Sequence, residues 1–417
     1  MTMTPPDQTI LISVSGPDRP GITAKLTELI AEADVRIADM EQVVVHGLLN
    51  LSIVMVFPTG NAGGTPLLKE LLFASKELGL ELDFKVLPSD TTMAPATRTK
   101  SVLTLIGADG ISARALSSIS RVISDSGFNI ETIQRLEQAQ VTCLELRVSS
   151  ENPKGPRTLK KALLPVAREN GVDVALQPDT FFRRVKRLVV FDLDSTLIQT
   201  EIIDEMAAAA GQAEQVKRLT ELAMNGELDF RQTLEQRVAL LAGLTTEAMD
   251  EISRNLPLTP GAEQLLLVLK RMGFRTAVIS GGFSYFTETI KKRLGLDYAF
   301  ANELEIVDGK LTGRLVGAIV DGQRKAEILE SIAQKEAIHM DQAIAIGDGA
   351  NDLPMLNKAG LGVAFNAKPS VRAVAEHSIN QTRLDAILFL LGISQRDIAA
   401  LDLRHSGADH PNKQEKP

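Results

Sequence analysis

The sequence has no tryptophan, two tyrosines and a single cysteine, and each shortage excludes a class of protein. With few aromatic platforms and a net charge of −8, the chain lacks the stacking surfaces and positive charge of nucleic-acid binders. The lone Cys143 cannot form an internal disulfide, and the five histidines show no metal-ligand spacing. The composition argues against structural zinc and favours a hard, oxygen-ligated metal.

Long hydrophobic runs are also missing. Leu265 to Leu269 and Ala386 to Leu391 fall far short of the roughly 18 to 20 residues needed to cross a bilayer. The start of the chain, MTMTPPDQ, lacks the basic and apolar segments of a secretory signal. We therefore expect a cytoplasmic protein with no membrane partner. The 417 residues predict about three domains.

An internal repeat with a period of about 90 residues occupies the first part of the chain. In the first copy, the apolar strand ILISVSG is followed by the turn GPDRPG and an amphipathic helix; the second copy starts at VLTLIGADGIS. Each copy predicts the order β-α-β-β-α-β, which is the ferredoxin-like arrangement. We predict a first domain over residues 1–90 and a second over residues 98–180, joined by a linker rich in Thr, Pro and Ala.

A third domain is predicted over residues 185–400, where strand and helix patterns alternate as in an α/β doubly wound parallel sheet. Residues 198–258 have a wholly helical pattern, which predicts a cap over the carboxyl ends of the strands. Thr259-Pro260-Gly261 predicts an N-cap that returns the chain to the core, and Asp308-Gly309 predicts a hairpin turn. The polar tail over residues 404–417 is predicted to be disordered.

Two groups of acidic residues follow predicted strands. Asp192 and Asp194 end the strand in FDLDST, and Asp348, Asn351 and Asp352 follow the strand AIAIG. An Asp-x-Asp sequence can also form an ordinary turn or cap a helix. If the acids instead meet at one sheet edge, they could complete an oxygen-only site for Mg²⁺.

A hydroxyl, free backbone amides and a lysine come from two further segments. Ser280, Gly281 and Gly282 end the strand in VISGGF, where they can hold phosphate oxygens. Lys325 begins a helix in DGQRKAEIL and offers a positive charge, although a lysine there is more often solvated. Four segments thus supply acid, hydroxyl, lysine and acid to one sheet edge, which indicates an active site.

These motifs resemble those of a known superfamily. DLDST, SGG, the lysine and GDGAND resemble the four motifs of the haloacid dehalogenase superfamily, over residues 187–393. Within it, DLDSTLIQTEIIDE, VISGGF and GDGANDLPML resemble the phosphoserine phosphatases. The resemblance implies Mg²⁺-dependent hydrolysis of O-phospho-L-serine to serine and phosphate, the last step of serine biosynthesis. The repeats resemble tandem ACT domains, which sense small ligands.

The resemblance implies distinct roles for the acids. Asp192 is the nucleophile that forms an aspartyl phosphate. Asp194 protonates the leaving serine oxygen and then deprotonates the attacking water, which requires a raised pKa. Mg²⁺ is expected on Asp192, the backbone carbonyl of Asp194 and Asp348, with Asp352 supporting the metal without binding it.

The phosphoryl group is expected to meet Lys325, Ser280 and the amide of Gly281, which neutralise its charge. Asn351 is expected to orient the substrate or the phosphate.

Substrate selection is assigned by the resemblance to Glu201 and Arg237, which suit an ammonium and a carboxylate. Without the resemblance, Arg237 could also be a snorkelling side chain or part of a structural ion pair, and Glu201 could be a solvated first-turn acid. Met224 and Phe230 are expected to close the apolar side of the site and exclude water.

The repeats are expected to bind a small amino acid, with serine as the expected ligand, at the GPDRPG turn of the first copy. Gly16 and Gly21 permit close approach to the backbone, and Asp18 could take the ammonium. Alternatively, both copies only mediate assembly into a homodimer.

Two other functions stay open from the sequence. One is a phosphatase for another small phosphomonoester. The other is an amino-acid-sensing regulatory protein with vestigial catalysis.

Overall fold

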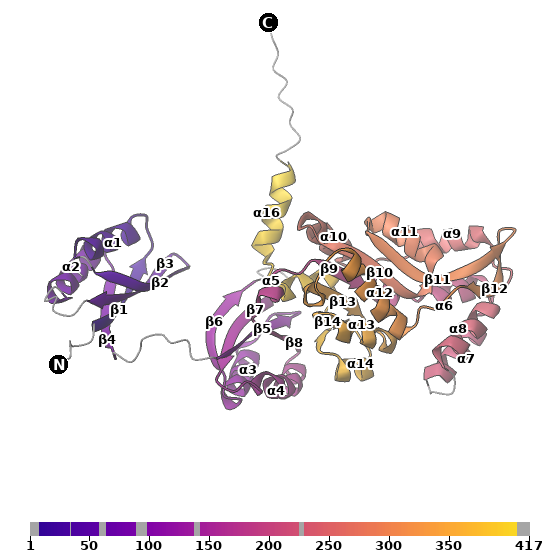
Figure 1. Ribbon diagram of the computed structural model, residues 1–417, viewed down its shortest axis with the longest axis horizontal. Helices are drawn as coiled ribbons and strands as arrows, with labels where there is room; N and C mark the ends of the chain where they lie inside the picture. Colours follow the sequence, from indigo (N-terminus) through magenta and orange to yellow (C-terminus); the bar gives the residue numbers. More distant parts are fainter. Residues whose placement is uncertain are drawn as a thin grey trace, which may run out of the picture. The chain divides into compact units, whose positions relative to one another are not determined.

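The computed structural model describes residues 8–33, 35–57, 64–88, 98–136, 142–224 and 229–406. The chain divides into two compact units, residues 1–96 and 97–417, which are drawn in Figure 1. In the part of the chain that the structure describes, no helix is long and apolar enough to span a membrane.

The first unit is one complete β-α-β-β-α-β repeat. Its elements are β1 (Gln8–Pro17), α1 (Ile22–Glu32), β2 (Arg36–Val45), β3 (Leu48–Phe57), α2 (Gly64–Glu77) and β4 (Glu81–Leu87). The antiparallel sheet has the order β2-β3-β1-β4, and Ile12 and Ile53 pack with Leu26 of α1 in its core. On the other face of the sheet, Val45 and Leu48 are more than half exposed.

The second repeat forms part of the second unit. It consists of β5 (Thr99–Gly107), α3 (Ala113–Asp125), β6 (Asn129–Arg135), β7 (Thr142–Ser150), α4 (Gly155–Glu169) and β8 (Val172–Pro178), and its sheet has the equivalent order β6-β7-β5-β8. Ile106, Cys143 and Ala175 of this sheet belong to the same buried cluster as Leu388 and Leu390 near the end of the chain. The second repeat therefore shares a hydrophobic core with the domain that follows it.

A seven-stranded sheet with the order β12-β11-β10-β9-β13-β14-β15 forms the centre of that domain. Its strands are β9 (Leu188–Phe191), β10 (Arg275–Phe283), β11 (Tyr298–Val307), β12 (Lys310–Val316), β13 (Ala343–Gly347), β14 (Leu361–Phe365) and β15 (His377–Ile379). All neighbours pair in parallel except β11 and β12. Successive residues of β9 belong to two different hydrophobic clusters, one on each face of the sheet: Val189 packs in the first and Val190 in the second. Both faces of the sheet are therefore covered.

Helices cover this sheet and cap one edge of it. The helices of the core are α10 (Ala262–Arg271), α11 (Ser284–Leu294), α12 (Gly322–Lys335), α13 (Leu353–Lys358), α14 (Pro369–Val374), α15 (Ile387–Leu390) and α16 (Gln395–Ser406). Those of the cap are α6 (Ile202–Ala209), α7 (Ala213–Met224), α8 (Phe230–Ala239) and α9 (Thr246–Asn255). The predicted fold class, a capped doubly wound domain after two ferredoxin-like repeats, is confirmed.

Two local predictions need adjustment. Helix α10 is capped by Gly261, with a φ of 82°, while the Thr259 hydroxyl donates to the Thr196 carbonyl at 2.7 Å. The prediction of Thr259 as the N-cap is therefore wrong, because Gly261 takes that position and the Thr259 hydroxyl is hydrogen-bonded to the loop after β9. The sequence predicts a disordered tail from residue 404, but α16 runs to Ser406, and residues 407–417 lie outside the described part of the chain.

Candidate active site

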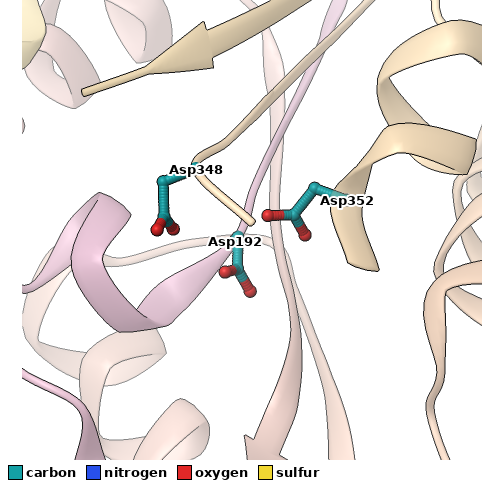
Figure 2. A group of neighbouring side chains, drawn as sticks. All are labelled: Asp192, Asp348 and Asp352. Carbon is teal, nitrogen blue, oxygen red and sulfur yellow. The ribbon is translucent and has the colours of Figure 1, made fainter. Parts of the chain in front are cut away.

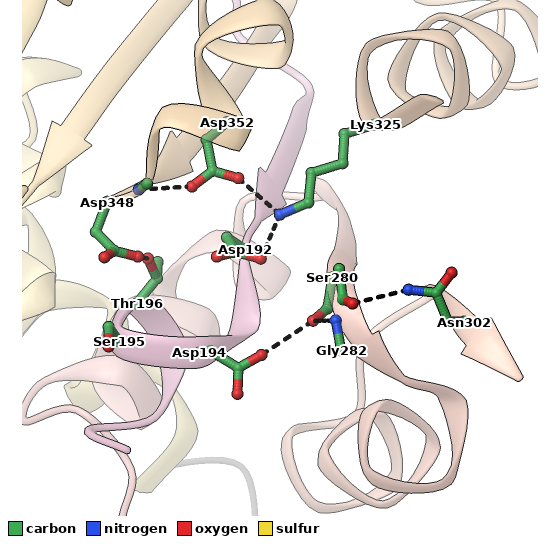
Figure 3. A network of polar contacts seen from close by, with 12 residues as sticks. Asp192, Asp194, Ser195, Thr196, Ser280, Gly282, Asn302, Lys325, Asp348 and Asp352 are labelled. Carbon is green, nitrogen blue, oxygen red and sulfur yellow. Dashed lines mark hydrogen bonds and ion pairs between the residues drawn. The ribbon is translucent and has the colours of Figure 1, made fainter. Parts of the chain in front are cut away.

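The candidate site lies at the carboxyl edge of the parallel sheet, where β10, β9 and β13 are neighbours. Asp192 follows β9, Ser280 lies near the end of β10, and Asp348 follows β13 (Figure 3). Because these strands run in the same direction, their polar continuations emerge side by side. The structure thus brings together residues that are far apart in the sequence.

Lys325 is the buried positive charge of the site. It lies in the first turn of α12, and its side chain is fully buried. Its Nζ donates to Oδ1 of Asp192 at 2.6 Å and to Oδ1 of Asp352 at 2.7 Å. Burial opposes the charged form, but the two carboxylates outweigh it and raise the pKa of Lys325 above its usual value. The lysine is a fixed ammonium and not a solvated one.

Three carboxylates crowd together beside this lysine. Asp192, Asp348 and Asp352 each place an oxygen within 4.8 Å of the others (Figure 2). Both oxygens of Asp352 are engaged, one by the lysine and one by the amide of Gly349 at 2.9 Å. Burial and the charge of Asp352 raise the pKa of Asp192, and the same two causes raise the pKa of Asp348 to about 7. A divalent cation would relieve this crowding of negative charge.

Asp194 occupies a different position, pointing from the loop after β9 toward β10. Its Oδ1 accepts from the amide of Ile202 at 2.8 Å, and its Oδ2 accepts from the Ser280 hydroxyl at 3.2 Å. That hydroxyl in turn accepts from the amide of Gly282 at 2.8 Å (Figure 3). Burial, followed by the charge of Glu201, raises the pKa of Asp194 to about 6. The carboxyl group can therefore gain and lose a proton near neutral pH.

A cavity of about 700 Å³ opens over these groups, between the sheet edge and the cap. Phe230 and Arg237 of α8 line it from the cap, and Asn351 and Gly281 line it from the core. A Cβ atom at Gly281 would stand 3.3 Å from the Phe230 ring, so the glycine allows this ring to approach the loop closely. Ser280 and Lys325 lie behind the cavity wall, since both are fully buried.

The two residues predicted to select the substrate both line this cavity. Arg237 is half-buried, and its Nη1 reaches the Thr220 hydroxyl at 3.5 Å, while its buried Nε has no hydrogen-bond partner among the described residues. Burial lowers the pKa of Arg237, against the charges of Asp204 and Glu201. Glu201 is exposed and accepts from the Ser195 hydroxyl at 2.9 Å. Met224 ends α7, but its side chain lies outside the described part of the structure.

Sequence reasoning missed two residues of this network. Asn302, buried in β11, donates to the Gly281 carbonyl at 2.7 Å and accepts from the amide of Val320 at 2.7 Å. Thr196 donates to Oδ1 of Asp348 at 3.2 Å. A lone asparagine inside an apolar strand is the signal that could have indicated the first; the second stands within FDLDST itself.

Comparison with known proteins identifies the class. The model of haloacid dehalogenase-like hydrolases matches residues 189–357, and two ACT-domain models match residues 8–85 and 99–177. The chain is also similar to the HAD family hydrolase t0658 of Salmonella enterica serovar Typhi, with 31% identity and a TM-score of 0.61 over 70% of this chain and 98% of that one. The chain thus contains a haloacid dehalogenase-like hydrolase domain and two ACT domains.

Sequence relatives identify the family. A phosphoserine phosphatase of Mycobacterium tuberculosis is 44% identical over 97% of this chain and 98% of its own length. One of Streptomyces coelicolor is 44% identical over 94% of each chain. The solved structure of a probable phosphoserine phosphatase of Vibrio cholerae is 31% identical, with a TM-score of 0.57 over 76% of this chain and 93% of that one. The chain belongs to the phosphoserine phosphatase family.

Proposed function

We propose that the chain hydrolyses O-phospho-L-serine with Mg²⁺ through a phosphoaspartyl intermediate on Asp192, as the last step of serine biosynthesis. The observation that carries the proposal is the arrangement at the sheet edge. A buried carboxylate lies 2.6 Å from a buried ammonium, and a second carboxyl with a pKa of about 6 lies close by. Phosphoryl transfer requires this combination of an oxygen nucleophile, positive charge and a proton donor.

The residues present suit a magnesium ion. Asp192 and Asp348 offer carboxylate oxygens, and the backbone carbonyl of Asp194 comes from the adjoining loop. Asp352 is less suited to bind the ion directly, because Lys325 and the amide of Gly349 already engage both of its oxygens. When bound, Mg²⁺ would neutralise the phosphoryl oxygens and the crowded carboxylates.

The proposed reaction has two proton-coupled steps. Asp192 attacks phosphorus, and Asp194 donates its proton to the departing serine oxygen. Asp194, now ionised, then removes a proton from the water that hydrolyses the aspartyl phosphate. Its hydrogen bonds to Ile202 and Ser280 hold the carboxyl in one orientation during both steps. Lys325 supplies positive charge to the phosphoryl group, and the Ser280 hydroxyl and the Gly281 amide are proposed to stabilise it as hydrogen-bond donors.

Substrate recognition is assigned to the cap side of the cavity. The unpaired buried Nε of Arg237 suits a substrate carboxylate, and the exposed Glu201 suits an ammonium. Phe230 covers the apolar side of the cavity, with Met224 proposed beside it, and Asn351 is proposed to orient the phosphate.

Phosphate release from a panel of phosphomonoesters, with Mg²⁺ or EDTA, tests the proposal. We expect phosphoserine to be preferred and EDTA to abolish activity. Preference for an ester without a carboxylate would favour the alternative of another phosphatase. No release from any ester would favour a sensor with vestigial catalysis.

The first ACT domain is proposed to bind serine at its GPDRPG turn. The two repeats differ at the start of their first helix: α1 has Gly21 at its N-cap and no side-chain cap, whereas the Ser112 hydroxyl caps α3 by accepting from the amide of Ala115. The first helix therefore keeps amides available for a carboxylate. Asp18 is exposed beside the turn, and Gly16 has a φ of 152° with Leu80 packed against it.

Calorimetric titration of the full chain with serine tests this assignment. The full chain is needed because the second repeat shares its core with the catalytic domain. We expect binding that Asp18→Ala weakens; no binding of serine would leave the repeats as assembly devices. We also propose a homodimer, formed through the open sheet face that carries Val45 and Leu48, and a monomeric mass by light scattering would contradict it.

A further inference from the structure

The second unit contains another cavity, of about 460 Å³, between the second ACT domain and the catalytic domain. Helix α4 and strand β8 line it on one side. On the other side, its lining residues precede the sheet strands: Lys186 comes before β9, Asp341 before β13 and Gly360 before β14. The cavity therefore lies at the amino edge of the sheet whose carboxyl edge carries Asp192, so it is no part of the catalytic site.

The lining of this cavity is rich in positive charge. Among the described residues, the basic side chains outnumber the acidic ones by five to two: Lys100, Arg157, Lys160, Arg183 and Lys186 against Asp341 and Glu376.

These cations differ in how far they are neutralised. Arg183 is buried and paired with Glu145 at 2.5 Å. Lys186 is also buried, but its Nζ donates to the backbone carbonyl of Asp341, which carries no charge. In the part of the chain that the structure describes, neither Arg157 nor Lys160 forms an ion pair.

Burial disfavours the charged form of two of these lysines. Burial lowers the pKa of Lys186 to about 8, despite the charge of Asp341 and with a further contribution from Arg183. Burial also lowers the pKa of Lys160, against the opposing charge of Glu376. A bound anion would replace the hydration that both ammonium groups have lost.

We propose that this cavity binds a small phosphorylated metabolite, which fastens the second ACT domain to the catalytic domain. Arg157 and Lys160 are three residues apart on α4, so they lie on the same face of the helix. A guanidinium fork and an ammonium together suit a phosphate group with two negative charges. Lys186 holds the ligand from the catalytic side, and the apolar Pro156 and Leu176 line the space for its remaining atoms.

Titration calorimetry of the full chain with inorganic pyrophosphate, in a buffer containing EDTA, tests the proposal. Without a divalent cation the catalytic cavity is lined by carboxylates and repels a polyanion, so the measured binding reports the basic cavity. We expect saturable binding and a higher Tm with pyrophosphate. Succinate, a dicarboxylate with two negative charges and no phosphate, is expected to bind at least tenfold more weakly.

Variants locate the binding. Arg157→Gln and Lys160→Gln should each weaken pyrophosphate binding by about tenfold, the order expected for one charge-assisted contact. Lys161→Gln is the matched control, because Lys161 is the exposed neighbour on α4 and does not line the cavity. Arg157 is exposed, so its variant should fold, and unfolding curves without ligand check this. The proposal is overturned by no saturable binding, by equal binding of succinate, or by equal affinities of Arg157→Gln and Lys161→Gln.

Discussion

Replacing Asp194 by asparagine separates acid catalysis from every other function of the site. The amide keeps the shape of the carboxyl, and its oxygen can still accept from the amide of Ile202 at 2.8 Å. Its NH₂ group would face the Ser280 hydroxyl, which can rotate to accept a hydrogen bond instead of donating one. We therefore expect Asp194→Asn to fold normally, with an unchanged position of Asp192.

The expected loss depends on the leaving group. Asp194 has a pKa of about 6, so about a tenth of the molecules carry the proton at pH 7. General-acid catalysis of this kind typically contributes about 10²- to 10⁴-fold, or roughly 3 to 5 kcal/mol of barrier. The full loss should appear with phosphoserine, whose alkoxide is a poor leaving group. An aryl phosphate, whose leaving group needs no proton, should lose far less.

Steady-state kinetics with phosphoserine and 4-nitrophenyl phosphate measures both losses. In the unmodified enzyme, kcat/KM for phosphoserine should fall as the pH rises above about 6, because the acid must be protonated to donate. The variant should lack this dependence. Equal losses on the two substrates would refute the role of Asp194 as the proton donor.

Three further predictions concern the nucleophile, the substrate and the metal. Asp192→Asn should abolish phosphate release while the circular dichroism spectrum stays unchanged, because an amide cannot accept the phosphoryl group; sustained turnover would contradict the covalent route. Arg237→Ala should reduce the transition-state stabilisation measured by kcat/KM for phosphoserine by about 2 to 3 kcal/mol, and that for ethanolamine phosphate much less. Equal losses on the two substrates would mean that Arg237 serves the phosphate or the fold. The pKa is raised to about 6 in Asp194 and to about 7 in Asp348, so the folded state keeps protons that the unfolded chain releases near pH 4. The metal-free protein should therefore lose stability as the pH rises from about 4 to 7. Mg²⁺ should therefore raise Tm more at pH 8 than at pH 5, and equal shifts would contradict this reasoning.

Much of the fold and part of the site could be predicted because the signals are local. The alternation of buried residues and the turns of each repeat lie within short windows, and Asp192 and Asp348 directly follow apolar strands. Parallel strands then bring such residues to one edge. The same local reasoning located Lys325 but could not predict its partners, because the two carboxylates that neutralise its charge come from other segments of the chain.

What could not be predicted depends on contacts between distant segments. Asn302 joins the Gly281 loop to Val320, and nothing in the residues around it indicates either partner. Thr259 has the sequence context of an N-cap, yet its hydroxyl meets a carbonyl 63 residues away. The exposed or buried state of a repeat's outer sheet face is likewise decided by what packs against it. The two repeats look alike in sequence pattern, but one face of the second sheet is part of the core of the catalytic domain.

That shared core determines where the chain can be shortened. A fragment starting at residue 185 would lose Ile106, Cys143 and Ala175, and would leave Leu388 and Leu390 exposed to solvent. A fragment starting at residue 97 keeps this packing, together with the hydrogen bond from Gln177 to the Leu390 carbonyl at 2.9 Å. The shortest fragment that folds well should therefore retain the second ACT domain. The first ACT domain has its own core, so it can be removed or fused to another protein as a separate domain.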